Sequence, residues 1–93
     1  METERHSFVA ECFWPGVRDS DLHALDARAL AHTAVLSRAG EDVRYLGSIL
    51  LREDEVVLCR FEGAPASVRR AALDAEIPFA RILEAAQSPW PLQ

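Results

Sequence analysis

The sequence from Asp42 to Glu62 is DVRYLGSILLREDEVVLCRFE. It contains two apolar runs, Val43–Leu51 and Val56–Phe61, which are separated by four charged residues. Runs rich in Val, Ile, Leu, Tyr and Phe are typical of β-strands, and a short polar break between two of them is typical of a β-hairpin. We therefore expect an antiparallel pair of strands in the middle of the chain.

A strand and a helix are predicted on the N-terminal side of this hairpin. The strand covers Ser7–Trp14 and ends at the turn signal Pro15-Gly16. The helix begins at Asp19-Ser20-Asp21, whose short polar side chains can accept hydrogen bonds from free backbone N–H groups. Gly40 ends this helix, because glycine takes a positive φ angle without steric cost.

A shorter helix and a last strand follow the hairpin. Pro65 is expected in the first turn of the helix, Pro78 ends the segment, and the strand covers Phe79–Ala85. The resulting order, β-α-β-β-α-β, is that of the ferredoxin-like fold. We therefore expect an α+β sandwich, with a four-stranded antiparallel sheet and two helices on one face.

The composition is that of one small folded domain, covering 1–93 with a core at about 7–85 and a tail at 86–93. In the tail, Trp90 and Leu92 are expected to pack on a surface. Of the 93 residues, 49% are hydrophobic, and the formal net charge is -5 without a basic run, so a nucleic-acid partner is not expected. No run approaches about 18 apolar residues and the N-terminus is polar, so we predict a cytoplasmic protein without a membrane span.

The predicted strands are apolar on both faces, because side chains alternate along a strand. One face of the first strand carries Phe8, Ala10, Cys12 and Trp14, and the other carries Val9, Glu11 and Phe13. In the hairpin, one face carries Val43, Tyr45, Gly47, Ile49 and Leu51 with Val57, Cys59 and Phe61, and the other carries Arg44, Leu46, Ser48 and Leu50 with Val56, Leu58 and Arg60. Two helices cover only one face, so we expect a homodimer with its sheets face to face.

Few polar groups lie on these faces. Glu11 and Arg60 fall on the face without helices, on strands that neighbour each other in this fold, and are predicted to form a charge pair. The pair would either fix the register of the dimer or anchor a ligand in a cleft between subunits. Cys12 and Cys59 are expected to meet as small buried groups on the helix-covered face. His32 is expected to pack on the apolar face of the first helix.

Several segments together resemble a known family. They are Phe8–Glu11 with Pro15-Gly16, Ala34–Leu36 through Gly40, Asp42–Tyr45 with Ser48, Cys59 and Phe61, Val68-Arg69, and Pro78, Arg81-Ile82 and Glu84. In their order and spacing they resemble the small actinobacterial nickel-binding-protein-like family, over about residues 7–85. The resemblance implies a ferredoxin-like dimeric α+β barrel. Family members often carry histidine where this chain has Gly47 and Ala71, so the metal site is not transferred to this chain.

Three functions remain open, and we favour the first, which is not enzymatic. It is a homodimeric small-ligand-binding or accessory protein, whose ligand would contact Glu11, Tyr45, Gly47, Cys59 and Arg60. The second is a small cofactor-free enzyme of the cyclase, isomerase or monooxygenase type, with acid–base and anion-binding groups drawn from Glu11, His32, Tyr45 and Arg60. The third is binding of nickel or another divalent transition metal through His6, His23 or His32. No other cofactor is expected.

Overall fold

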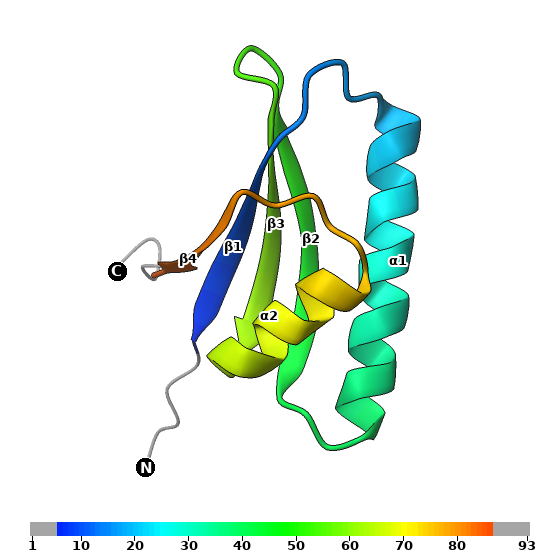
Figure 1. Cartoon of the computed structure of the whole chain (residues 1–93), viewed down its shortest axis with the longest axis vertical. Helices are drawn as coiled ribbons and strands as arrows, with labels where there is room; N and C mark the ends of the chain where they lie inside the picture. The colour runs from blue at the N-terminus through cyan, green and yellow to red at the C-terminus, as the bar shows by residue number, and fades with distance from the viewer. Residues whose placement is uncertain (1–5, 87–93) are drawn as a thin grey trace, which may run out of the picture.

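The computed structural model describes residues 6–86 (Figure 1). The elements follow the predicted order and are β1 (Ser7–Phe13), α1 (Asp19–Arg38), β2 (Val43–Leu51), β3 (Val56–Gly63), α2 (Pro65–Asp74) and β4 (Arg81–Ala85). The strands form one antiparallel sheet in the order β2-β3-β1-β4, and both helices lie on the same face of it (Figure 1). This is a ferredoxin-like α+β fold, as predicted. The prediction for Trp90 and Leu92 lies outside the described residues.

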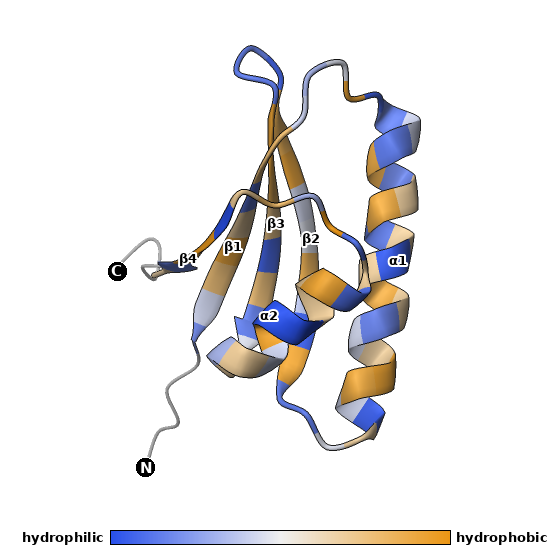
Figure 2. Ribbon diagram, in the orientation of Figure 1, coloured by the Kyte–Doolittle hydropathy of each residue, from blue (hydrophilic) through white to orange (hydrophobic). Residues whose placement is uncertain are grey.

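The core lies between the sheet and the two helices, and hydrophobic residues, orange in Figure 2, recur along the strands and both helices. Its largest fully buried side chains are Phe61, Leu25, Val43, Val57, Val68, Cys12 and Cys59. The predicted faces of β1 and β3 are therefore confirmed, since every second residue of each strand is buried. Small residues such as Ala71 and Ala72 let α2 pack closely on the sheet.

Hydrogen bonds at the helix ends fix both helices. The backbone N–H of Arg18 donates to Oδ2 of Asp21 at 2.9 Å, so the N-cap is Arg18, one residue before the predicted start. Gly40 follows α1 with φ = +96°, as expected for a glycine after the last turn. Nε of Arg28 donates to the backbone oxygen of Ala75 at 2.9 Å, which ties α1 to the end of α2.

The last strand starts later than predicted, at Arg81 instead of Phe79. The N–H of Phe79 donates to the backbone oxygen of Ile77 at 2.8 Å, so this part of the chain is still turning. Phe79 packs against the core, and Ala80 donates to the backbone oxygen of Glu11 at 2.8 Å before the ladder begins. The apolar character of Phe79 therefore reflects burial in a turn.

A β-bulge changes the faces of β2. The register pairs Tyr45 with Phe61 and Gly47 with Arg60, which leaves Leu46 as an extra residue. Gly47 has φ = +108°, a conformation that glycine adopts readily. Beyond the bulge, alternation is shifted by one residue: Ser48 and Leu50 face the helices, and Ile49 and Leu51 face away. The prediction that Gly47, Ile49 and Leu51 share a face with Val43 and Tyr45 is wrong for this reason.

Candidate functional site

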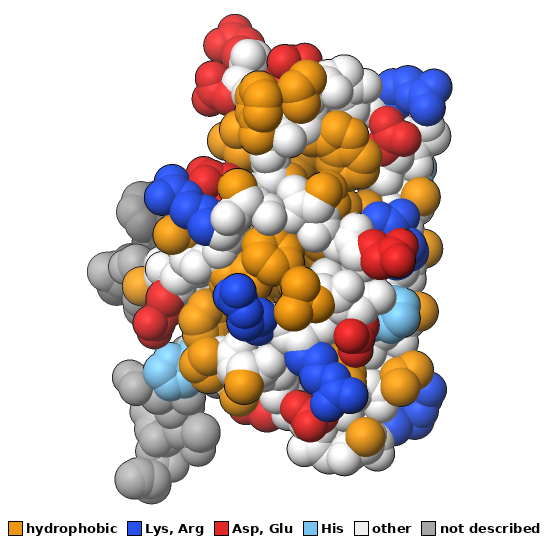
Figure 3. All heavy atoms as spheres, viewed as in Figure 1, with side chains coloured by type: hydrophobic (Ala, Val, Ile, Leu, Met, Phe, Trp, Pro, Cys, Tyr) orange, Lys and Arg blue, Asp and Glu red, His pale blue; other side chains and the backbone are white. Residues whose placement is uncertain are grey.

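The face of the sheet without helices, which we call the open face, carries exposed apolar side chains on three of its strands. They are Phe13, Leu46, Ile49, Leu51 and Leu83. Phe13 is 65% exposed and Ile49 is 42% exposed, although both belong to strands. On the side that carries the helices, Figure 3 shows charged side chains of both signs among the apolar areas. Several large exposed apolar side chains on one face of a sheet are typical of an interaction surface.

Two ion pairs neutralise charges on the open face. Nε of Arg81 lies 2.6 Å from Oε1 of Glu11, across the β1–β4 ladder, and Arg44 pairs with Glu62 across the β2–β3 ladder. The predicted pair between Glu11 and Arg60 is therefore wrong. The register explains it, because Glu11 stands opposite Leu58 on one side and Arg81 on the other, whereas Arg60 stands opposite Val9.

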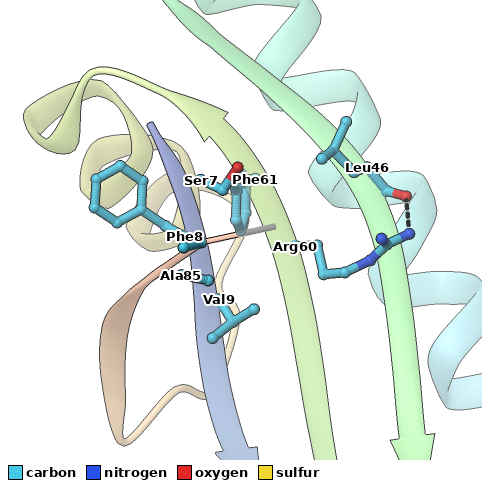
Figure 4. A pocket seen from close by; sticks show the side chains of 8 residues that line it. Ser7, Phe8, Val9, Leu46, Arg60, Phe61 and Ala85 are labelled. Atoms are coloured by element: carbon cyan, nitrogen blue, oxygen red, sulfur yellow. Dashed lines mark hydrogen bonds between the residues drawn. The ribbon is translucent and has the colours of Figure 1, made fainter. Parts of the chain in front are cut away.

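Arg60 has no such partner among the described residues. Its Nη2 donates to the backbone oxygen of Leu46, at the bulge of β2, at 3.0 Å (Figure 4). Its Nε is covered and has no hydrogen-bond acceptor within residues 6–86. Gly47 lies beside it, since a Cβ built there would be 3.9 Å from Nη2. The Arg60 side chain thus crosses from β3 to β2. Its positive charge has one described hydrogen-bond acceptor, the neutral backbone oxygen of Leu46.

A hollow of about 180 Å³ adjoins Arg60 on this part of the sheet (Figure 4). Its lining consists of Ser7, Phe8, Val9, Leu46, Arg60, Phe61, Ala85 and Ala86. Arg60 is the single charged residue in this lining, and most of the other residues are apolar. Pockets for drug-sized ligands span roughly 300–1,000 Å³, so this hollow fits a small ligand, or part of one that a second surface covers.

A second polar cluster lies on the helix-covered side, between α1 and β2. The Tyr45 hydroxyl donates to Oδ1 of Asp26 at 2.5 Å, and Oγ of Ser48 donates to the same oxygen at 2.8 Å. The bulge makes this possible, because it places Ser48 on the same side as Tyr45. Asp26 was not predicted from sequence; its position directly after buried Leu25 on the sheet-facing side of α1 was the available signal.

Burial governs the chemistry of this cluster. Burial, followed by the hydrogen bond to Asp26, raises the pKa of the Tyr45 hydroxyl far above its usual value of about 10. The contact with Cys12, together with burial, raises the pKa of the neighbouring Cys59 thiol. Cys12 and Cys59 are both buried, as expected, and are free cysteines. Protonated, buried groups of this kind hold α1 on the sheet and are poor proton acceptors or nucleophiles at neutral pH.

Alkaline titration should reveal the state of Tyr45, which is the chain's single tyrosine. In the unfolded chain the phenol ionises near pH 10, whereas in the fold it keeps its proton. The contribution of Tyr45 to the free energy of unfolding is therefore expected to be constant below about pH 10 and to fall as the pH rises further. Absorbance at tyrosinate wavelengths should rise only when the protein unfolds. A rise near pH 10 in folded protein would contradict the buried hydrogen bond to Asp26.

The predicted ligand set is divided by the sheet. Glu11, Gly47 and Arg60 lie at the open face, whereas Tyr45 and Cys59 are buried on the helix-covered side. The predicted enzymatic set is divided in the same way, since Glu11 and Arg60 lie across the sheet from Tyr45. His32 lies partly buried on α1, and the fully buried positions of its stripe are Leu25, Ala29, Thr33 and Leu36.

The three histidines lie apart, His6 just before β1 and both His23 and His32 on α1. His6 stacks on Phe8, with ring centroids 6.4 Å apart, and its Nδ1 lies 3.2 Å from Oε2 of Glu84. His23 is exposed on α1, about two and a half turns before His32. Within residues 6–86, no three His, Cys, Asp or Glu side chains lie together as a group that could hold a metal ion. In the same residues, no helix is both long and apolar enough to cross a membrane.

The fold is similar to that of a solved structure. The crystal structure of SCO4226 from Streptomyces coelicolor A3(2) matches with a TM-score of 0.68 and 21% sequence identity, over 89% of this chain and 99% of that chain. No protein-family model matches the sequence, and no curated protein matches it. At this level of identity the likeness shows the fold alone, a small α+β domain that spans nearly the whole of both chains.

Proposed function

We propose that this protein is a non-catalytic binding protein that works as a homodimer, in which two copies pair through their open faces and enclose a small ligand. The observation that carries the proposal is the set of exposed apolar side chains on three strands of this face, Phe13, Leu46, Ile49, Leu51 and Leu83. A second copy offers the same apolar surface, so a two-fold pairing buries both at once. A stable pairing of this type buries roughly 1,600 Å² in total.

The charges on the open face are compatible with such burial. The carboxylates of Glu11 and Glu62 are already held by arginines of the same chain. Removing water from paired charges is far less unfavourable than removing it from isolated ones. Arg60 is the exception, and it stands beside the hollow, which is where a bound ligand would be enclosed.

The resemblance of residues 7–85 to the nickel-binding-protein-like family supports the same assembly, because that family forms dimeric barrels. We propose that the chain is a divergent relative of this family. Its departures at Gly47 and Ala71 favour a ligand other than nickel, since neither residue offers an imidazole.

Native mass spectrometry with and without added nickel and zinc tests the proposal. It reads mass, stoichiometry and bound ions in one experiment. We expect twice the mass of one chain and no fixed complement of either ion. A monomer at micromolar concentration would contradict the assembly, and a dimer carrying a constant number of nickel ions would contradict the choice of ligand.

A further inference from the structure

We infer that the hollow beside Arg60 binds a small monocarboxylate with an apolar body. The inference rests on the proposed function and deepens it by naming the class of ligand. Two independent observations carry it, the charge of Arg60 that no described carboxylate neutralises and the apolar lining of the hollow next to it.

The charge argument starts from the other arginines of the open face. Arg81 and Arg44 each hold a carboxylate of the same chain, whereas the described acceptor of Arg60 is the neutral backbone oxygen of Leu46. Its Nε has lost contact with water without gaining an acceptor in the described part of the chain. A covered donor of this kind is unfavourable, and more so when the donor is charged. An oxyanion against the terminal N–H groups of Arg60 would balance this charge and would add charged acceptors to the one neutral acceptor that Leu46 provides.

Dimer formation makes an anionic partner for Arg60 still more favourable. Pairing of the open faces removes water from the Arg60 guanidinium, and a buried charge without a partner is strongly unfavourable. A guanidinium binds a carboxylate through two parallel N–H···O hydrogen bonds, which fits a planar carboxylate group better than a neutral oxygen. The ligand would therefore be held most tightly in the assembled dimer.

The lining of the hollow restricts the rest of the ligand. Val9, Leu46 and Ala85 offer apolar contacts, and Arg60 is the only cationic side chain among the lining residues. A phosphate or a dicarboxylate carries more negative charge than one arginine can balance, and a sugar would leave hydroxyl groups without partners against these walls. A single carboxylate on a compact apolar group, such as an aromatic ring or a short aliphatic chain, satisfies both parts of the site.

Benzoate and benzamide are suitable probes, because they have nearly the same shape and differ in charge. The full chain is labelled with ¹⁵N, and the Arg60 Nε–H signal is followed during titration with each probe. The signal is assigned by its loss in the variant Arg60→Gln. Arg52→Gln is the matched control, since Arg52 lies in the hairpin turn and pairs there with Asp19 at 3.2 Å.

We expect benzoate to shift the Arg60 signal in a saturable way and benzamide to leave it unchanged. Arg60→Gln should weaken benzoate binding, followed through backbone amides near the hollow, by about tenfold or more, and Arg52→Gln should not change it. Arg60→Lys keeps the positive charge but lacks the planar guanidinium group, so its affinity for benzoate should lie between those of the wild type and Arg60→Gln. It serves as the test variant if Arg60→Gln does not fold.

Sedimentation of the same samples separates the two proposals. A dimer without a saturable benzoate shift would overturn the inference and leave the proposed assembly standing. Equal binding of benzoate and benzamide, or unchanged binding in Arg60→Gln, would overturn it as well. A monomer that binds benzoate through Arg60 would support the ligand class and overturn the proposed assembly.

Discussion

Gly63→Ala is expected to lower the free energy of unfolding by more than about 3 kcal/mol, or to prevent folding at 37 °C. Gly63 ends β3 with φ = +142°, a conformation that residues with a Cβ rarely adopt. A Cβ at this position would overlap the backbone oxygen of Asp42 and would lie 2.8 Å from the carbonyl carbon of Asp42 and from Cα of Val43. These are backbone atoms, so no rotation of a side chain can relieve the overlap.

Gly40→Ala separates the two effects that act at Gly63. Gly40 also has a positive φ, +96°, but a Cβ built there meets nothing within 4 Å. The Gly40→Ala variant should therefore lose only the free energy of unfolding that the positive φ angle costs a residue with a Cβ, about 1–2 kcal/mol. Urea unfolding followed by circular dichroism gives both values under one condition. Equal losses in the two variants would contradict the close approach of β3 to the start of β2.

The contact also shows why this glycine matters for the fold. The N–H of Ala64 donates to the backbone oxygen of Asp42 at 2.8 Å, and the N–H of Gly63 donates to the backbone oxygen of His6 at 2.9 Å. The end of β3 is therefore held between the starts of β1 and β2. These hydrogen bonds require the three backbones to lie closer together than a side chain would permit.

The elements and the core could be predicted from sequence wherever one periodic pattern ran unbroken. In β1 and β3 every second residue is buried, so the apolar alternation determined the faces correctly. In β2 one extra residue at Leu46 reversed the alternation, and a run that is apolar at nearly every position gave no sign of the reversal. Gly47 was the one visible signal, because an isolated glycine within a strand often marks a bulge.

The candidate site was less predictable because it depends on register. Arg60 was correctly placed on the open face, but its distance from Glu11 depends on which residues stand opposite each other across β1. Period-two alternation determines the face of a residue and leaves its partner undetermined. Asp26 was missed for a related reason, since its two donors come from β2 and only the bulge brings Ser48 to the same side as Tyr45.

Ile49→Asp is expected to convert the proposed dimer into a monomer, with association weakened by at least about a hundredfold. Ile49 lies on the open face of the edge strand β2, opposite Leu58, and is 42% exposed in the single chain. The folded monomer therefore tolerates a polar group at this position. In the dimer the substitution appears twice, once from each copy, and places an unpaired carboxylate in an apolar contact. Equilibrium sedimentation over a range of concentrations measures the effect.

Leu73→Asp is the matched control for this variant. Leu73 is 58% exposed on α2, so it exceeds Ile49 in exposure but lies on the side of the domain that carries the helices. If the open face is the dimer contact, Leu73→Asp keeps the wild-type association constant and Ile49→Asp loses it. If general surface hydrophobicity drives association, both variants weaken it to a similar extent. Loss in Leu73→Asp alone would move the contact to the helices and leave the open face, with Arg60, exposed to solvent.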